Sequence, residues 1–245
     1  MVIKILLLIL PVIGGMLAAS YTKKFVEQRF FPLLLNFSAS FLLGVTVFHL
    51  LPELFGAHNH GISHVEEPSV FLTGFFILCG FFLQLLIDQF SRGVEHGHVH
   101  HHGKKANLWL IVISLSIHSL FDGSIVSGEH YERMIMPVML HKFPAATVLA
   151  SLILMETPSV KSKKFYLMMS IFGVAAPVGL FLTDSLHHMA FDHLIHWITA
   201  IVAGNFLHIA ASLFLESRKE HKIKTNEAIA IFIGFILAAT TIWFH

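Results

Sequence analysis

Apolar residues in this chain form long unbroken runs separated by short polar stretches. Eight of these runs have about the 20 residues that a helix needs to cross the hydrocarbon core of a bilayer. They lie at residues 2–20, 33–55, 69–90, 107–127, 135–156, 165–183, 194–216 and 227–244. The runs lack the period-two alternation of transmembrane β-strands. The pattern therefore predicts an all-α integral membrane protein with eight spans.

Composition supports this reading, because 55% of the 245 residues are hydrophobic and the mean hydropathy is +0.74. The connections between the runs are short, so we expect residues 1–245 to form a single transmembrane domain. The first run could be mistaken for a secretory signal, because it ends in the small residues Ala18, Ala19 and Ser20. Lys23 and Lys24 follow the apolar core, however, which is the wrong side for a signal peptide and favours a first span.

The net charge of +1 conceals an uneven distribution of Lys and Arg. Basic residues concentrate in the loops after the first, third, fifth and seventh runs, whereas the alternate loops and the termini hold only Lys4 and Arg133. The positive-inside rule places the basic loops in the cytoplasm and both termini outside. Because the basic residues are divided among four short loops, nucleic-acid binding is not expected.

Histidine is the residue in excess, with 19 copies, whereas Cys79 is the single cysteine and excludes an intramolecular disulfide. Residues 95–102 read EHGHVHHH within the predicted cytoplasmic loop 91–106, a composition typical of weak metal-binding segments. The predicted external loop 56–68 carries three further histidines and two glutamates. That loop is compatible with low-affinity cation capture and equally with a plain solvated loop.

The fourth run contains the sequence SLSIHSLFDGSIVSGE at 114–129, which carries His118 and Asp122 one helical turn apart. Residues four apart share a face of a helix, so the imidazole and the carboxylate would converge. An ionisable pair at membrane depth is costly and by default marks an ion or substrate path. The alternative, a buried hydrogen bond that ties two helices together, is about as probable from these residues alone.

Further candidates lie in the second, fifth and seventh runs. His49 and Glu53 are again four apart, at the predicted outer end of the second span, and suit either a metal site or a polar helix end. In the fifth span, His141 and Lys142 precede Pro144, and a lysine at this depth requires a partner such as Asp122 or a backbone carbonyl.

We expect His118, Asp122 and His141 at comparable depth, with His208 and Asn205 of the seventh span as further candidates beside them. Two imidazoles and one carboxylate suit Zn²⁺, Fe²⁺ or Mn²⁺. The absence of thiolate ligands favours a transport site, which must release its ion, over a structural site. At the predicted outer surface, His188, Asp192 and His196 would share one face of a continuous helix, as a second cation site or as an interfacial polar stretch.

Six segments together carry a resemblance to a known family. They are HLLPE at 49–53, the His-rich loop, HSLFDG at 118–123, HK followed by proline at 141–144, AAPVG at 175–179 and AGNFL at 203–207. In this order, within eight spans, the chain resembles the ZIP (Zrt/Irt-like) divalent-metal transporters over essentially its full length. The HK pair resembles the His-Lys subgroup of that family.

The resemblance implies import of a divalent metal into the cytosol and an inverted 3+2+3 repeat of spans. It implies site residues at His118, Ser119, Asp122, His141 and Lys142, with Asp122 in place of a more usual Glu. Lys142 stands where many relatives have a carboxylate, so we expect one ion per site. Zinc is the first expectation, with iron, manganese and cadmium as alternatives, all as transported substrates and none as a tightly bound cofactor.

The expected partners are divalent metal ions and the lipid bilayer, with a homodimer left open. The expected location is a bacterial inner membrane or a plasma membrane, with several spans. A ceramidase-like intramembrane zinc hydrolase is the main alternative, because it also uses membrane His and Asp residues. A cation-efflux protein fits less well, because such proteins typically have six spans and a cytoplasmic metal-binding domain. A purely structural protein leaves the histidine excess unexplained.

Overall fold

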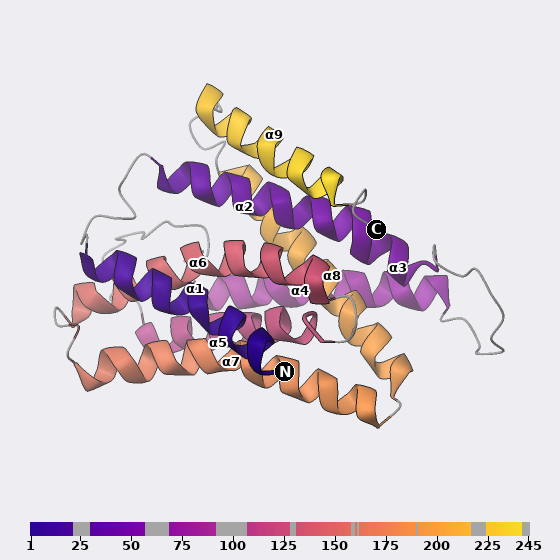
Figure 1. The fold of residues 1–245 in the computed structure, drawn as a ribbon, viewed down its shortest axis with the longest axis horizontal. Helices are drawn as coiled ribbons and strands as arrows, with labels where there is room; N and C mark the ends of the chain where they lie inside the picture. Colours follow the sequence, from indigo (N-terminus) through magenta and orange to yellow (C-terminus); the bar gives the residue numbers. More distant parts are fainter. Residues whose placement is uncertain are drawn as a thin grey trace.

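The chain is described by a computed structural model covering residues 1–21, 30–56, 69–91, 107–127, 131–157, 160, 162–189, 191–216 and 224–241. These residues form helices and no strands, which confirms the predicted all-α class (Figure 1). The helices are α1 (Val2–Tyr21), α2 (Phe31–Val45), α3 (Leu51–Leu54), α4 (Val70–Ser91), α5 (Leu108–Ser124), α6 (Tyr131–Glu156), α7 (Lys163–His188), α8 (Asp192–Glu216) and α9 (Thr225–Thr240). A π-helical turn, η2 (Thr46–Leu50), joins α2 to α3.

Each of the eight apolar runs coincides with one helical segment, and α2, η2 and α3 together make the second. Six of these segments in the described part of the chain are long and apolar enough to cross a membrane. The other two, α5 and α9, are shorter apolar helices of 17 and 16 residues. The largest difference from the predicted boundaries is in α7, which continues to His188 rather than ending at 183.

The π-helical turn has a local cause in the sequence. Proline at position 52 has no N–H to donate to the carbonyl of Phe48, and its ring would clash with that carbonyl in a regular α-helix. The backbone relieves this conflict by widening for one turn, so that the Leu51 N–H bonds to the Thr46 carbonyl five residues earlier. Such turns occur frequently at functional sites, and this one contains His49.

The helices pack in four extensive pairs, namely α1 with α6, α2 with α9, α4 with α8, and α5 with α7. The list of pairs is unchanged when α1 is exchanged with α7, α2 with α8, α4 with α9 and α5 with α6. The α1–α6 pair then becomes the α7–α5 pair, and the α2–α9 pair becomes the α8–α4 pair. The pairing therefore has the symmetry that an inverted repeat of three spans around a central pair requires. In Figure 1, α2 and α9 lie along one side of the bundle, and α5 and α7 along the opposite side.

Small residues allow the paired helices to approach closely. A Cβ atom on Gly123 of α5 would overlap the carbonyl of Ala176 in α7, and a Cβ atom on Gly179 of α7 would overlap the carbonyl of Leu120 in α5. Such reciprocal glycine contacts are how membrane helices gain dispersion energy without a hydrophobic driving force. The α5–α7 contact is thereby fixed one residue away from Asp122.

The distribution of side chains is that of a membrane bundle. Large apolar side chains point outward, among them Phe71, Phe181 and Phe232, which are 79%, 62% and 65% exposed. Four ionisable side chains of α5 and α6 are instead buried inside, namely His118, Asp122, His141 and Lys142. An outer surface of this kind is stable against lipid rather than water, and the protein is a multi-pass membrane protein.

Candidate metal site

The first half of the candidate site is built on α5. The Asn107 side chain starts this helix by accepting a hydrogen bond from the Trp109 N–H, at 3.1 Å. Regular α-helix then places His118 and Asp122 one turn apart on the same face, and the His118 Nε2 atom lies 3.5 Å from the Asp122 Oδ1 atom. The predicted convergence of this imidazole and carboxylate is therefore present.

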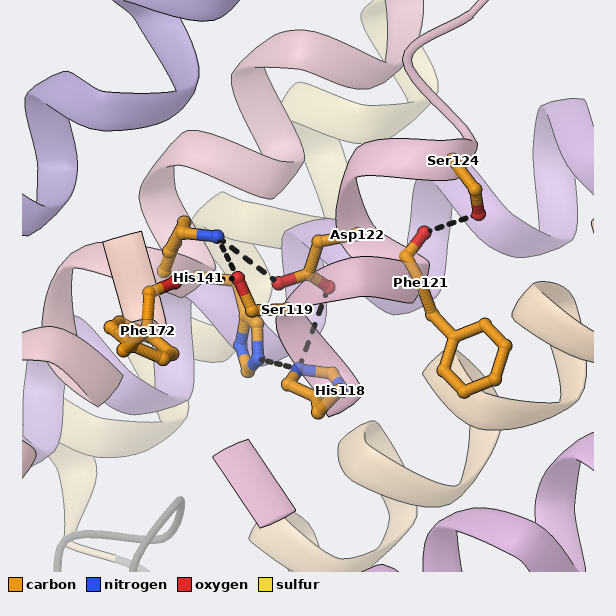
Figure 2. Close-up of polar contacts among 8 residues, drawn as sticks. His118, Ser119, Phe121, Asp122, Ser124, His141 and Phe172 are labelled. Atoms are coloured by element: carbon orange, nitrogen blue, oxygen red, sulfur yellow. Dashed lines mark hydrogen bonds and ion pairs between the residues drawn. The ribbon is translucent and has the colours of Figure 1, made fainter. Parts of the chain in front are cut away.

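The second half comes from α6, which brings His141 against His118. The two Nε2 atoms lie 3.4 Å apart, with the ring planes nearly perpendicular at 89°. Figure 2 shows His118, Asp122 and His141 directed toward one another in the interior. His118 Nε2 is thus the common point of two short separations, one to an imidazole nitrogen and one to a carboxylate oxygen.

Lys142 completes the cluster from the next position of α6. Its ammonium donates to the Ser119 hydroxyl, lies 4.0 Å from Asp122 Oδ2, and sits 5.2 Å from the ring centroid of Phe172 in α7. The Ser119 hydroxyl in turn donates to the Phe172 carbonyl at 3.3 Å. Asp122 is thereby confirmed as a partner of Lys142, and Ser119, predicted as a metal ligand, here links Lys142 to α7.

The electrostatics of the cluster depend on its burial. His118, Ser119, Asp122, His141 and Lys142 are each no more than 2% exposed. Asp122 also lies in the last turn of α5, where the negative end of the helix dipole disfavours a carboxylate. The Lys142 ammonium partly offsets both effects, because an opposite charge nearby stabilises a buried carboxylate.

The separations match those of metal ligands in part. Neighbouring ligands of a tetrahedral Zn²⁺ ion, with bonds of about 2.05 Å, lie about 3.3 Å apart, close to the two separations centred on His118. Within the part of the chain that the structure describes, however, no group of three or more His, Cys, Asp or Glu side chains is arranged to hold a metal ion. The cluster is therefore a pair of facing imidazoles with a carboxylate beside one of them, rather than a closed cage.

His49 and Glu53, predicted as a pair, have different surroundings. His49 is buried and its Nε2 atom lies 2.7 Å from the Thr241 hydroxyl, just after α9. Glu53 is exposed and lines a pocket at the end of α3. The cation site predicted at His49 and Glu53 stays a prediction.

His208, also predicted as a metal ligand, lies between α4 and α8. Its Nε2 atom is 3.3 Å from Asp88 Oδ2, and its ring packs edge-on against Phe81. Under the exchange of α2 with α8 and of α9 with α4, this contact is the counterpart of the His49–Thr241 contact. Each of these histidines therefore joins two paired helices.

The cation site predicted on one continuous helix at the outer surface is wrong, and two predicted His-rich loops lie outside the described residues. His188, Asp192 and His196 do not share a continuous helix, because α7 ends at His188 and α8 begins at Asp192. The chain changes direction between these two helices (Figure 1). The histidines of the external loop 56–68 and of the tract 95–102 lie outside the described residues.

Sequence reasoning missed two partners that the structure reveals. Phe172 receives both the Ser119 hydroxyl at its carbonyl and the Lys142 ammonium at its ring, and nothing in an apolar run signals such a role. The second is Asp88 of α4, the partner of His208. The sequence did carry a signal for the Asp88–His208 pair, because a carboxylate in one span and a histidine in another are each costly to bury unless they are paired.

Comparison with known proteins identifies the family. A family model described as "ZIP Zinc transporter" matches residues 1–108 and 94–241. Mouse "Zinc transporter SLC39A7" is 33% identical over 78 residues, covering 29% of this chain and 16% of that protein. "Protein zntD" of Dictyostelium discoideum is 25% identical over 172 residues, covering 62% of this chain and 25% of that protein. The matched segments span a quarter or less of these relatives, but the family match covers nearly the whole chain, which therefore belongs to the ZIP zinc transporter family.

Proposed function

We propose that this protein carries a divalent transition metal, zinc first, across the bilayer into the cytosol, through a site formed by His118, His141 and Asp122. The observation that carries the proposal is the convergence of His118 Nε2 with an imidazole nitrogen and a carboxylate oxygen, at 3.4 and 3.5 Å, inside a bundle of this family. The family comprises transporters rather than enzymes, which argues against the ceramidase-like hydrolase.

The charge balance of the cluster supports transport rather than permanent binding. Asp122 and Lys142 carry opposite charges, so with neutral imidazoles the cluster has no net charge before an ion arrives. A divalent ion would therefore leave two uncompensated positive charges in a buried site, which limits its affinity. Weak binding of this kind suits a site that must take up and release its ion. Iron, manganese and cadmium remain alternative cargoes, because imidazole and carboxylate ligands discriminate poorly among these metals.

The proposal is tested by metal flux into proteoliposomes that contain a chelating dye. Wild-type protein should show saturable Zn²⁺ uptake, and His118→Ala or Asp122→Ala should lower its rate by at least about 100-fold, since each removes a direct ligand. His188→Ala is the matched control, because the His188 side chain is 83% exposed and lies outside the central cluster. Absence of uptake by a folded wild-type protein would overturn the proposal.

Lys142 sets the expected number of ions. Its fixed ammonium, 4.0 Å from Asp122, should repel a second cation, so equilibrium dialysis should find one Zn²⁺ bound at the central cluster. Lys142→Glu reverses this charge and adds a ligand, and should raise the stoichiometry of the cluster to two. Only the zinc binding that is lost in His118→Ala should be counted, so that zinc bound by surface histidines is excluded. Two such ions in the wild type, or one in a folded Lys142→Glu variant, would contradict this role.

A further inference from the structure

A second group of potential cation-binding side chains lines a pocket at one end of the bundle, away from the α5–α6 cluster. The pocket lies where α3 and α7 end and α8 begins, and its polar lining is Glu53, His187, Asp192, His196 and Thr199. These helix ends lie at the same end of the bundle in Figure 1. By the positive-inside argument, this end faces the outside of the cell. We refer to it as the outer pocket.

The outer pocket is built by the turns that the sequence places there. The π-helical turn before α3 and the corner between α7 and α8 bring Glu53 and Asp192 to the same cavity from distant parts of the chain. His196 is fixed in its wall, because its Nε2 atom lies 3.0 Å from the hydroxyl of Thr73 in α4. The neighbouring Trp197 stacks on Phe76, with ring centroids 4.8 Å apart, which anchors the start of α8 to α4.

The size of the outer pocket indicates what it could accept. Its volume is about 200 Å³. A water molecule takes up about 30 Å³ of liquid volume, so the cavity has room for an ion with a first shell of about six waters. The carboxylates and imidazoles of the lining are not arranged as a cage around a bare ion, since no such group of three occurs among the described residues. Room for a water shell and oxygen acceptors around it suit a hydrated cation.

We propose that the outer pocket captures a hydrated divalent cation through hydrogen bonds from the ion's waters to Glu53 and Asp192, before the ion loses its water shell and reaches the central cluster. This inference rests on the proposed transport function and deepens it by assigning a first binding step. The two carboxylates attract the cation electrostatically, and His187, His196 and Thr199 accept further hydrogen bonds from its waters. A negatively lined cleft raises the local cation concentration and its on-rate by about tenfold or more.

The probe for this step is hexaamminecobalt(III), a cation whose ligands do not exchange and whose size resembles that of a hydrated divalent metal. It should fit the outer pocket but cannot coordinate His118 or His141. Added to the predicted outer side of proteoliposomes, it should inhibit Zn²⁺ uptake competitively. In Glu53→Gln/Asp192→Asn, that inhibition should disappear, and the KM for Zn²⁺ should rise about tenfold with little change in kcat.

Asp184→Asn is the matched control. Asp184 lies in the last part of α7, 3.6 Å from His188, and is not among the pocket-lining residues. It removes one carboxylate near the same end of the bundle without altering the pocket. Both the KM and the inhibition by hexaamminecobalt(III) should stay at wild-type values in this variant.

The outcomes separate the two proposals. Equal inhibition of the wild type and the double variant, or no inhibition of an active wild type, would overturn the outer pocket while leaving the central site standing. If the wild type transports no metal, the transport function fails, and calorimetric titration with hexaamminecobalt(III) still tests the pocket. Binding that is lost only in Glu53→Gln/Asp192→Asn supports it, whereas binding that is absent or unchanged refutes it.

Discussion

Replacing Asp122 with Asn should destabilise the whole bundle, and replacing Lys142 with Met in the same chain should restore much of the lost stability. In the wild type the Lys142 ammonium lies 4.0 Å from Asp122 Oδ2 and is only 1% exposed. Asp122→Asn leaves that ammonium buried without its counter-charge. Breaking a buried ion pair on one side typically costs about 3–5 kcal/mol, whereas replacing both members with neutral groups is often nearly neutral.

The measurement is thermal unfolding of purified protein in detergent, together with metal flux. Asp122→Asn should lower the Tm by about 6–20 °C, given about 2–4 °C per kcal/mol for a protein of this size. Asp122→Asn/Lys142→Met should recover most of that difference in Tm. Both variants should remain without transport, because both lack the carboxylate of the central site.

A matched control separates this effect from the general cost of altering a charge pair. Lys164 and Glu156 form an ion pair at 3.5 Å whose side chains are 42% and 40% exposed. Exposed pairs typically contribute less than about 1 kcal/mol, so Glu156→Gln should leave the Tm almost unchanged. Equal Tm values for Asp122→Asn and Glu156→Gln would show that the buried pair does not stabilise the fold.

The helices could be predicted because the sequence pattern that specifies each helix lies within that helix. Long apolar runs specified the eight helical segments to within a few residues, and i, i+4 spacing placed His118 beside Asp122 on α5. A lysine at membrane depth also indicated that Lys142 needed a partner, and Asp122 was the nearest carboxylate in the predicted site. Each of these inferences depends on helix geometry or on the cost of burying a charge.

Contacts between helices were less predictable, because they depend on how each helix is rotated about its own axis and on which faces pack together. His208 is of a residue type that binds metals, but its ring faces Asp88. Ser119 was predicted as a metal ligand, but its hydroxyl hydrogen-bonds to Lys142 and Phe172. The contact of His49 with Thr241, which follows α9, likewise depends on how α2 and α9 pack together. A shift of one residue rotates a side chain by about 100° around the helix axis, enough to move it into another interface.

The close crossing of α5 and α7 is the basis of the second prediction. Gly123→Ala should destabilise the bundle and impair transport together. The added Cβ would fall on the Ala176 carbonyl and on other backbone atoms of α7. Backbone cannot rotate away as a side chain can, so α5 and α7 must separate. Overpacking a core usually costs about 1–3 kcal/mol, which corresponds to a Tm lower by about 2–12 °C.

Transport should fall as well, because Gly123 directly follows Asp122 and a displaced α5 moves both His118 and Asp122 away from His141. The internal control is Gly74→Ala on α4, where an added Cβ meets no atom within 4 Å. Alanine is favoured over glycine within helices by up to about 1 kcal/mol, so Gly74→Ala should match or exceed the wild-type Tm with full flux. If Gly123→Ala behaved like Gly74→Ala in both measurements, the α5–α7 crossing would not be what positions the site. Loss of flux and of Tm in Gly123→Ala alone would tie the geometry of the metal site to one glycine contact.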